Sequence, residues 1–265
     1  MAKALAPKWK AALESAIAEF PKQTVLQLST LDSQPSPFSL TVAPRVRSHI
    51  FRSFLSPPSQ PNLPLIHTTT DIRTPKVDQI TSNPHTPVEV AWWIEGRQQQ
   101  FRIRGKAVII GSPGDPRNGS FAHWRDVVRG AQSPGSDAAN DGQSTGYLGL
   151  KSLTLSPSFD WEQQRISSFK AMSAHMKASW CRPVPGTPLE GGQEEAKKWP
   201  VRLEELTPDS SDEDKKNWQV ALNNFALVII EPVFVDLVDL AVIPNRRFFY
   251  ERDEKGNWEE KEVVP

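Results

Sequence analysis

The segment His67–Pro84, HTTTDIRTPKVDQITSNP, places two cationic side chains, Arg73 and Lys76, around a Thr-Pro step. Thr74 is a residue type favoured at a helix N-cap, and Pro75 is favoured at the first helical position. The pattern predicts a short helix that begins at Pro75 and ends at Asn83-Pro84. The Thr74 hydroxyl, the Lys76 ammonium and the free N–H groups of the first turn would then converge on one point. Such an arrangement suits a phosphate group.

Further cations fall on two segments that alternate like strands. RSHIFR has Arg47 and Arg52 at its ends, and QQFRIRGK carries Gln100, Arg102 and Arg104 on one face. A sheet face with several arginines can be merely solvated. Taken with the Lys76 turn, the pattern indicates a cationic region built mainly on strands.

The elements that must position these residues are predicted from alternation and turn residues. Strands are expected at 24–32, 37–55 (broken at Pro44), 62–70, 88–110 (a hairpin turning at Glu95-Gly96), 223–232, 235–242, 245–252 and 258–264. Helices are expected at the N-terminus, ending before Pro21, and over 159–180. Strands at both ends with helices between them favour one closed sheet completed by both ends of the chain. We therefore predict a single α+β, mainly β domain over 1–265.

Two polar segments interrupt this pattern. Residues 111–158 are rich in Gly, Pro, Ser, Asp and Asn, and contain one short helical candidate at 121–130. Residues 190–217 form the second segment. We expect both to be surface insertions.

Composition narrows the class of protein. The 31 Lys and Arg balance the 31 Asp and Glu, so the chain lacks the field of a general nucleic-acid binder. Its single cysteine, Cys181, excludes an intrachain disulfide and a zinc site built on several cysteines. The histidines show no metal-ligand spacing. No apolar run reaches membrane-spanning length, and the N-terminus is too polar for a signal peptide. We expect a cytoplasmic protein with no metal, nucleic-acid or membrane partner.

The ordered set of motifs resembles one known family. Arg47-x4-Arg52, then Thr70-x3-Thr74-x-Lys76, then Trp92-Trp93 and QFRIRG, resemble the FMN-binding split β-barrel of the pyridoxamine-phosphate-oxidase family, in particular its oxidase-like sub-branch with TD-x-R-[ST]-x-K. The C-terminal RRFFY resembles that family's final hairpin. The resemblance covers most of the chain outside the two polar segments.

The resemblance implies a split barrel, an FMN cofactor and a homodimer with flavin sites at its interface. By resemblance, Arg47, Thr74 and Lys76 hold the FMN phosphate, Gln100 bonds the isoalloxazine ring, and Arg247 approaches that ring. The full implied contact set is Arg47, Ser48, His49, Ile50, Arg52, Thr69, Thr70, Arg73, Thr74, Lys76, Gln100 and Arg247. No catalytic acid or base is implied.

The chain also departs from the family. The true oxidases carry an Arg-Leu-His segment that grips the vitamin B6 substrate, whereas AVIPNRR has Ile243 and Asn245 in those places. Three functions stay open: an FMN-dependent oxidoreductase of uncertain substrate, a non-catalytic protein that binds or senses flavin or B6 phosphate, and a haem-binding split barrel with His49 as axial ligand.

Overall fold

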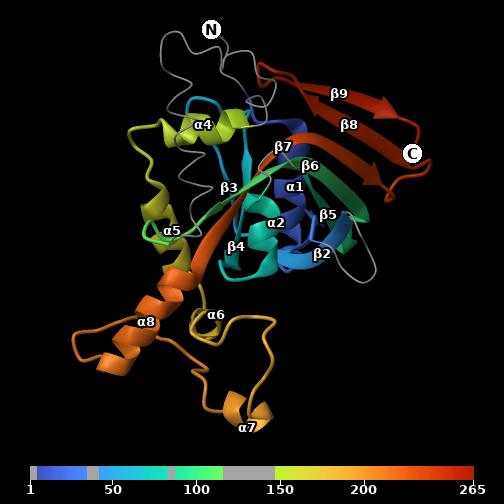
Figure 1. Ribbon diagram of the computed structural model, residues 1–265. Helices are drawn as coiled ribbons and strands as arrows, with labels where there is room; N and C mark the ends of the chain where they lie inside the picture. Colours follow the sequence, from blue (N-terminus) through green and yellow to red (C-terminus); the bar gives the residue numbers. More distant parts are fainter. Residues whose placement is uncertain (1–4, 35–41, 83–86, 116–146) are drawn as a thin grey trace.

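The computed structural model of the chain describes residues 5–34, 42–82, 87–115 and 147–265 (Figure 1). The helical candidate at 121–130 and the expected helix end at Asn83-Pro84 lie outside these ranges. None of the helices within them is long and apolar enough to cross a membrane.

One antiparallel sheet of nine strands forms the body of the molecule, in the order β2-β1-β5-β6-β7-β4-β3, with β8 on β7 and β9 on β8. The strands are β1 (Val25–Asp32), β2 (Ala43–Ile50), β3 (Ser53–Leu55), β4 (Leu65–Asp71), β5 (Val88–Ile94), β6 (Gln99–Ile110), β7 (Phe225–Asp239), β8 (Arg246–Arg252) and β9 (Trp258–Val263). The predicted hairpin is confirmed as β5 and β6, joined by the 3₁₀ turn η1 (Glu95–Arg97).

The long strand β7 splits the sheet. Along one edge it pairs with β6, while on its other edge the first half pairs with β4 and the second half pairs with β8. The sheet therefore diverges along β7, and β2 and β3 are left as the two ends of the strand order. The mainly β, split-barrel class is confirmed, but the expectation of a closed sheet is wrong.

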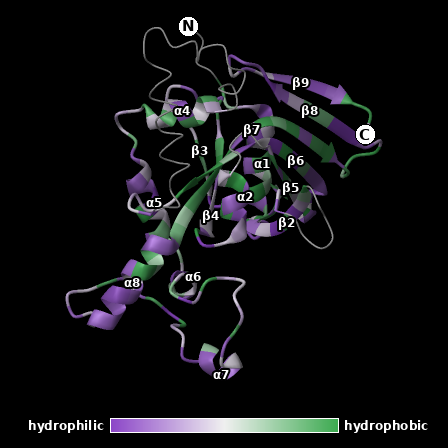
Figure 2. Ribbon diagram, viewed as in Figure 1, coloured by the Kyte–Doolittle hydropathy of each residue, from purple (hydrophilic) through white to green (hydrophobic). Residues whose placement is uncertain are grey.

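Helices cover both sides of the sheet (Figure 1). On one side α1 (Lys8–Glu19) and α2 (Pro75–Thr81) pack on a core that includes Trp9, Leu28, Trp92 and Phe101. On the other side, α4 (Leu148–Thr154), α5 (Trp161–Lys170), α6 (Ala174–Ser179) and α8 (Asp212–Asn224) contribute to a second core with the first half of β7. Residues 182–211, between α6 and α8, form a polar arm that projects from the body and carries the short helix α7 (Gly192–Ala196) (Figure 2).

Several predicted boundaries need correction. Pro232 does not end a strand, because β7 runs through it with a register shift opposite Arg104/Gly105. Gly105 permits this, since a Cβ there would lie 2.2 Å from the Glu231 carbonyl oxygen. Pro44 lies inside β2, and the break falls after Ile50. The expected helix over 159–180 is two helices, α5 and α6.

The first polar segment is described only at 111–115 and 147–158. Its end folds as α4, whose Leu150 and Leu153 are buried in the second core. The second segment contains α7 and the start of α8, where Ser211 and Asp214 form a capping box.

Candidate functional site

Arg47 lies on the inward face of the edge strand β2. Register places it opposite Leu28 of β1, whose side chain is fully buried. The guanidinium donates from Nη1 to Thr30 Oγ1 (2.6 Å) and to the Leu28 carbonyl (3.3 Å), and from Nη2 to Gln79 Oε1 (2.7 Å). These neutral acceptors fix its orientation without neutralising its charge.

Lys76 reaches the same region from α2. Its ammonium donates to the hydroxyls of Thr70 and Thr74, each at 3.0 Å. The helix begins at Pro75 as predicted, but the Thr74 hydroxyl donates to the Asp71 carbonyl (2.7 Å) rather than capping the helix. The Val77 N–H already bonds the Thr74 carbonyl (2.9 Å). The Thr74 hydroxyl hydrogen is therefore engaged within the chain, and the Lys76 ammonium is the charged donor of this turn.

His49 lies two residues along β2 from Arg47, on the same face. Its Nδ1 is 3.3 Å from the hydroxyl of Thr68 on β4, so the ring spans from β2 to β4. Thr68 and Thr70 share a face of β4, and Thr70 holds Lys76. We call Arg47, His49, Thr70, Thr74 and Lys76 the cation cluster.

The positive charge of the cation cluster is not compensated. Within the described residues, neither Arg47 nor Lys76 has a carboxylate partner in an ion pair. Burial, with the charge of Arg47 nearby, lowers the pKa of Lys76 to about 8. Burial and the charge of Arg45 likewise lower the pKa of Arg47. Two half-buried cations, each with a pKa lowered by burial and by a neighbouring arginine, are held by neutral hydrogen-bond acceptors and form a site that fits an anion.

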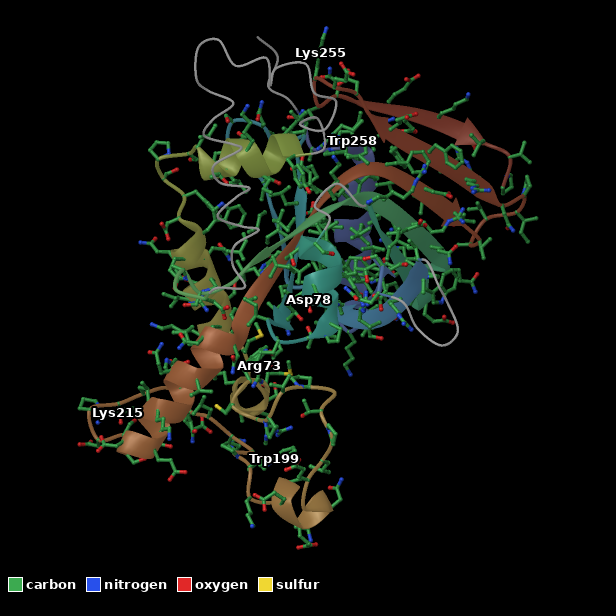
Figure 3. The ribbon with its side chains drawn as sticks, viewed as in Figure 1. Arg73, Asp78, Trp199, Lys215, Lys255 and Trp258 are labelled. Carbon is green, nitrogen blue, oxygen red and sulfur yellow. The ribbon has the colours of Figure 1, made fainter. Side chains whose placement is uncertain are left out.

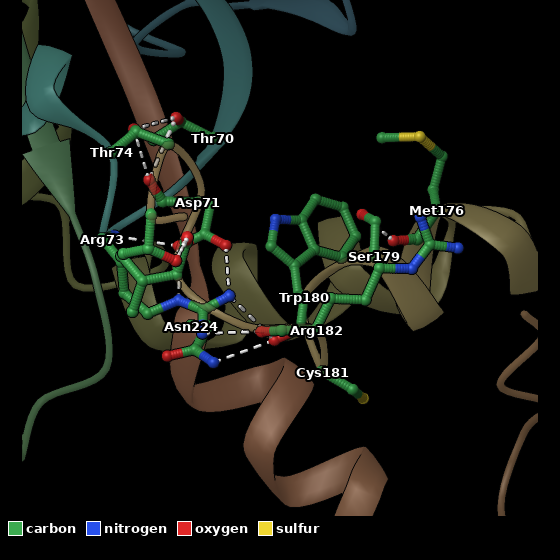
Figure 4. A network of polar contacts seen from close by, with 12 residues as sticks. Thr70, Asp71, Arg73, Thr74, Met176, Ser179, Trp180, Cys181, Arg182 and Asn224 are labelled. Atoms are coloured by element: carbon green, nitrogen blue, oxygen red, sulfur yellow. Dashed lines mark hydrogen bonds and ion pairs between the residues drawn. The ribbon is translucent and has the colours of Figure 1, made fainter. Parts of the chain in front are cut away.

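Arg73 does not join the cation cluster. Its guanidinium forms a two-pronged ion pair with Asp71 (3.0 Å and 2.7 Å), and also donates to the carbonyls of Arg182 (2.9 Å) and Trp180 (3.4 Å) (Figure 4). Asn224 donates to the same Trp180 carbonyl (2.8 Å). Arg73 thus ties the turn before α2 to the segment after α6.

Arg52 and Thr69 lie beside the cation cluster rather than in it. Thr69 is on the face of β4 that His67 shares, opposite to Thr70. Burial lowers the pKa of Arg52, and its Nε is buried without a partner. The charge of Arg52, after burial, also contributes to lowering the pKa of His67 to about 4.

The remaining predicted contacts point to the outer face of the sheet. Registered pairs run from Ser48 through Gln27 and Ala91 to Arg102 and Asp236, and directly opposite side chains share a face. The row continues from Asp236 to Phe249 on β8. Ile50, Gln100 and Arg247 each lie two positions along a strand from a member of this row, and they therefore share its face. Arg247 donates to Asp236 (3.0 Å and 2.9 Å), which also pairs with Arg102.

Sequence reasoning missed three residues that organise the cation cluster: Thr30, Thr68 and Gln79. Thr30 carried a signal, because it is a polar residue at an inward-facing position of β1, after Leu26 and Leu28. Gln79 lies three residues after Lys76 on α2, on a neighbouring part of the helix surface. Only the structure shows that both accept from Arg47.

The projecting arm carries a separate surface pocket of about 700 Å³, lined by residues that include Arg182 and Trp199. Figure 3 shows Trp199 on the arm and Arg73 where α2 approaches it. The lining of this pocket contains none of the predicted FMN contacts. Within the described residues, no group of three or more His, Cys, Asp or Glu side chains is placed to hold a metal ion.

Comparison with solved structures supports the fold. The chain is similar to a pyridoxamine 5'-phosphate oxidase-related, FMN binding protein from Nostoc punctiforme, with 21% identity and a TM-score of 0.62 over 99% of this chain and 100% of that one. PhzG from Burkholderia lata, in complex with tetrahydrophenazine-1-carboxylic acid, is 14% identical with a TM-score of 0.43, covering 98% and 93% of the two chains. None of the curated proteins compared with the chain matches it.

A family model identifies the part of the chain that holds the cation cluster. Residues 6–111, from α1 to the end of β6, match the pyridoxamine 5'-phosphate oxidase, FMN-binding domain. FMN is the cofactor of this domain, and the uncompensated cations Arg47 and Lys76 fit its phosphate. Residues 6–111 of the chain are thus similar to pyridoxamine 5'-phosphate oxidase FMN-binding domains.

Proposed function

We propose that the protein is an FMN-dependent oxidoreductase whose cation cluster binds the cofactor phosphate. The observation that carries the proposal is the uncompensated pair Arg47 and Lys76, held by hydroxyl and amide oxygens. A phosphate monoester has a charge of about −1.5 to −2 at pH 7, which matches the two cations. Thr70 and Thr74 orient the Lys76 ammonium, and Thr30 and Gln79 orient the Arg47 guanidinium.

The isoalloxazine ring requires contacts that one copy of the chain does not offer at the cation cluster. Gln100 and Arg247 lie on the outer face of the sheet, whereas Arg47, His49 and Lys76 gather on the inner side. The outer face also exposes Val25, Val46, Ile50 and Trp93. We propose that a second copy covers this face, so that a homodimer joins the cation cluster of one copy to Gln100 and Arg247 of the partner.

A mixing experiment tests this arrangement. Lys76→Ala would lack the phosphate contact, and a Gln100→Ala/Arg247→Ala variant would lack the ring contacts. In mixed dimers made by co-expression, one site is intact and the other doubly defective, so about a quarter of all sites should bind FMN normally. If both sets act within one copy, co-expression restores no binding. Light scattering that gives a monomer mass for the FMN-loaded protein would contradict the dimer.

Bound FMN would supply two-electron transfer between a small donor and an acceptor. The protein groups hold and orient it. Arg47 and Lys76 would bind the phosphate, while Gln100 and Arg247 would contact the edge of the isoalloxazine ring. The Asp236 carboxylate keeps Arg247 in place, and its side-chain hydrogen bond is the main cause of the raised pKa of Arg247. Arg247 therefore stays cationic in the working pH range. We expect the protein to act in the cytoplasm, where the lone thiol of Cys181 stays reduced.

One observation favours a second candidate, a non-catalytic protein that binds flavin or B6 phosphate. The positions that resemble the oxidase substrate clamp are Ile243 and Asn245, in the turn between β7 and β8. Ile243 is 97% exposed and has no donor, and Asn245 offers only a neutral amide, so neither side chain supplies the cationic donors of the clamp. Pyridoxamine phosphate is therefore not the expected electron donor.

Stopped-flow spectroscopy separates the two candidates. The FMN-loaded protein is mixed anaerobically with nicotinamide nucleotides, amines, alcohols and pyridoxamine phosphate, and loss of the oxidised flavin band is followed. For an oxidoreductase, the rate of bleaching depends on the donor and lies on the time scale of enzyme turnover. With the same donor, free FMN bleaches more slowly. Bleaching no faster than free FMN with every donor class supports the binding protein instead.

A further inference from the structure

His49 carries an orphaned polar atom within the cation cluster. Its side chain is only 5% exposed, and its Nε2 is buried without a hydrogen-bond partner. A buried nitrogen without a partner costs free energy that a ligand can recover. His67, on the other face of β4, provides a contrast, because its Nδ1 and Nε2 both lie near hydroxyls, those of Ser53 (3.1 Å) and Ser168 (3.4 Å).

The neighbouring hydroxyl fixes the tautomer of His49. Thr68 has one hydroxyl hydrogen, which it donates to the Ile50 carbonyl (2.8 Å). The Thr68 oxygen can then only accept from Nδ1 of His49, so Nδ1 carries the hydrogen. In the neutral ring, Nε2 is consequently a bare lone pair, able to accept a proton but not to donate one.

The charges around His49 keep its ring neutral in the free protein. Arg47 lies on the same strand and Lys76 on α2, while the facing position on β4 is the uncharged Thr68. Burial, then Lys76 and Arg47, lower the pKa of His49 to about 4. Nearby, the carboxylate of Asp71 is paired with Arg73, and it raises the pKa of Lys76 by less than burial and Arg47 lower it.

We propose that His49 takes up one proton from solvent at Nε2 when FMN binds. The resulting N–H group donates a hydrogen bond to an oxygen of the cofactor phosphate. This inference rests on the proposed function, because it requires the phosphate to occupy the cation cluster. A phosphate dianion offers only acceptor oxygens, which repel the bare Nε2 lone pair. One added proton turns that repulsion into a charge-assisted hydrogen bond, and the phosphate offsets the cations that disfavour imidazolium.

The consequence is a proton-linked affinity. If one proton is taken up at His49, the dissociation constant for FMN rises about tenfold per pH unit around neutrality. Lys76 adds a smaller contribution, since its pKa of about 8 leaves about a tenth of the ammonium groups deprotonated at pH 7. Together they predict about twentyfold weaker binding at pH 8 than at pH 7.

Calorimetric titration of the full chain with FMN at pH 7, in two buffers of different ionisation enthalpy, counts the protons directly. The wild type should take up about one proton per FMN. His49→Gln keeps a polar side chain that can donate without titrating, so it should still bind FMN. We expect that variant to take up about a tenth of a proton, and to lose only about twofold in affinity from pH 7 to pH 8.

The matched control is His67→Gln, which changes a buried histidine of similarly lowered pKa outside the cation cluster. It should take up the same number of protons as the wild type. Wild-type protein that binds FMN with an uptake equal to that of His49→Gln would overturn the role of His49 and leave the proposed function standing. Failure of the folded wild type to bind FMN at all would overturn both.

Discussion

Two cations of one turn, Arg73 and Lys76, lie three residues apart and have opposite surroundings. Arg73 is 13% exposed and meets a carboxylate and two carbonyls, which satisfy its guanidinium within the chain. Lys76 meets two hydroxyls and another cation, and its pKa falls to about 8. The spacing of the two residues in the sequence does not distinguish them, whereas charge compensation does.

This difference separates a cation that stabilises the fold, Arg73, from a cation that is available to bind an anion, Lys76. Removing the partner of a buried ion pair leaves an unpaired charge and costs stability. Removing a cation that has no counter-charge relieves repulsion and costs only ligand affinity. Substitutions at Asp71, Lys76 and Arg45 test the two sides of this difference.

The largest effect is expected at Asp71. Asp71→Ala leaves the Arg73 guanidinium without its carboxylate, and should lower the free energy of unfolding by about 3–5 kcal/mol in urea denaturation. Asp78→Ala, an exposed carboxylate on α2, is the matched control, with an expected change within about 0.5 kcal/mol. Equal losses for the two variants would show that the Arg73 network does not stabilise the turn.

On the other side of the comparison, Lys76→Met should weaken FMN binding by about one to two decades, since a charge-assisted bond contributes roughly 1.5–3 kcal/mol. Stability without FMN should stay the same or rise, because one of two repelling cations is gone. Flavin fluorescence titration and thermal melts measure the two quantities. Lys22→Met, in the exposed turn after α1, should change neither, and a destabilised Lys76→Met would remove the contrast with Arg73.

The pH dependence of stability follows from the lowered pKa of Lys76. Between pH 8 and the ordinary lysine value, the unfolded chain binds a proton that the folded chain has released. The free energy of unfolding of the FMN-free protein therefore increases as pH rises above 8. The increase is on the order of 1 kcal/mol after solvent screening, and it is absent at lower pH. Lys76→Met should lack this gain in urea titrations at pH 7 and pH 9.5, and an identical gain in the variant would assign it to other groups.

The smallest effect is expected at Arg45, which lies two residues from Arg47 and is half-exposed. It pairs with Asp32 at 3.1 Å, an ion pair near the surface. Arg45→Ala should cost at most about 1 kcal/mol of stability and change the FMN dissociation constant by less than about threefold. A loss of affinity as large as that of Lys76→Met would extend the cation cluster to Arg45.

The strands that carry the cation cluster were predictable because their alternation shows which side chains point inward. The pairing of β5 with β6 and the start of α2 at Pro75 followed from turn and cap residues. The continuity of β7 was not predictable, because Pro232 is tolerated only where Gly105 lets the two backbones approach. The split of the sheet depends on the same long strand.

The sequence names Arg73 and Lys76 alike as candidate FMN contacts, and it does not show that, within the described residues, only Lys76 lacks a carboxylate partner. The carbonyls that engage Arg73 come from Trp180 and Arg182, more than a hundred residues away, so no local pattern reveals them. The bond between His49 and Thr68 likewise joins strands that are not neighbours in the strand order. The two faces of the sheet, which separate Gln100 from the cation cluster, follow only from the register.

The central claim is that Arg47 and Lys76 form an anion site for the FMN phosphate. Fluorescence titration of the wild-type protein with FMN and with riboflavin, which lacks the phosphate, tests it most directly. Two charge-assisted contacts predict that FMN binds at least about a hundredfold more tightly than riboflavin, and that Lys76→Met narrows the gap. Equal dissociation constants for FMN and riboflavin would contradict the claim.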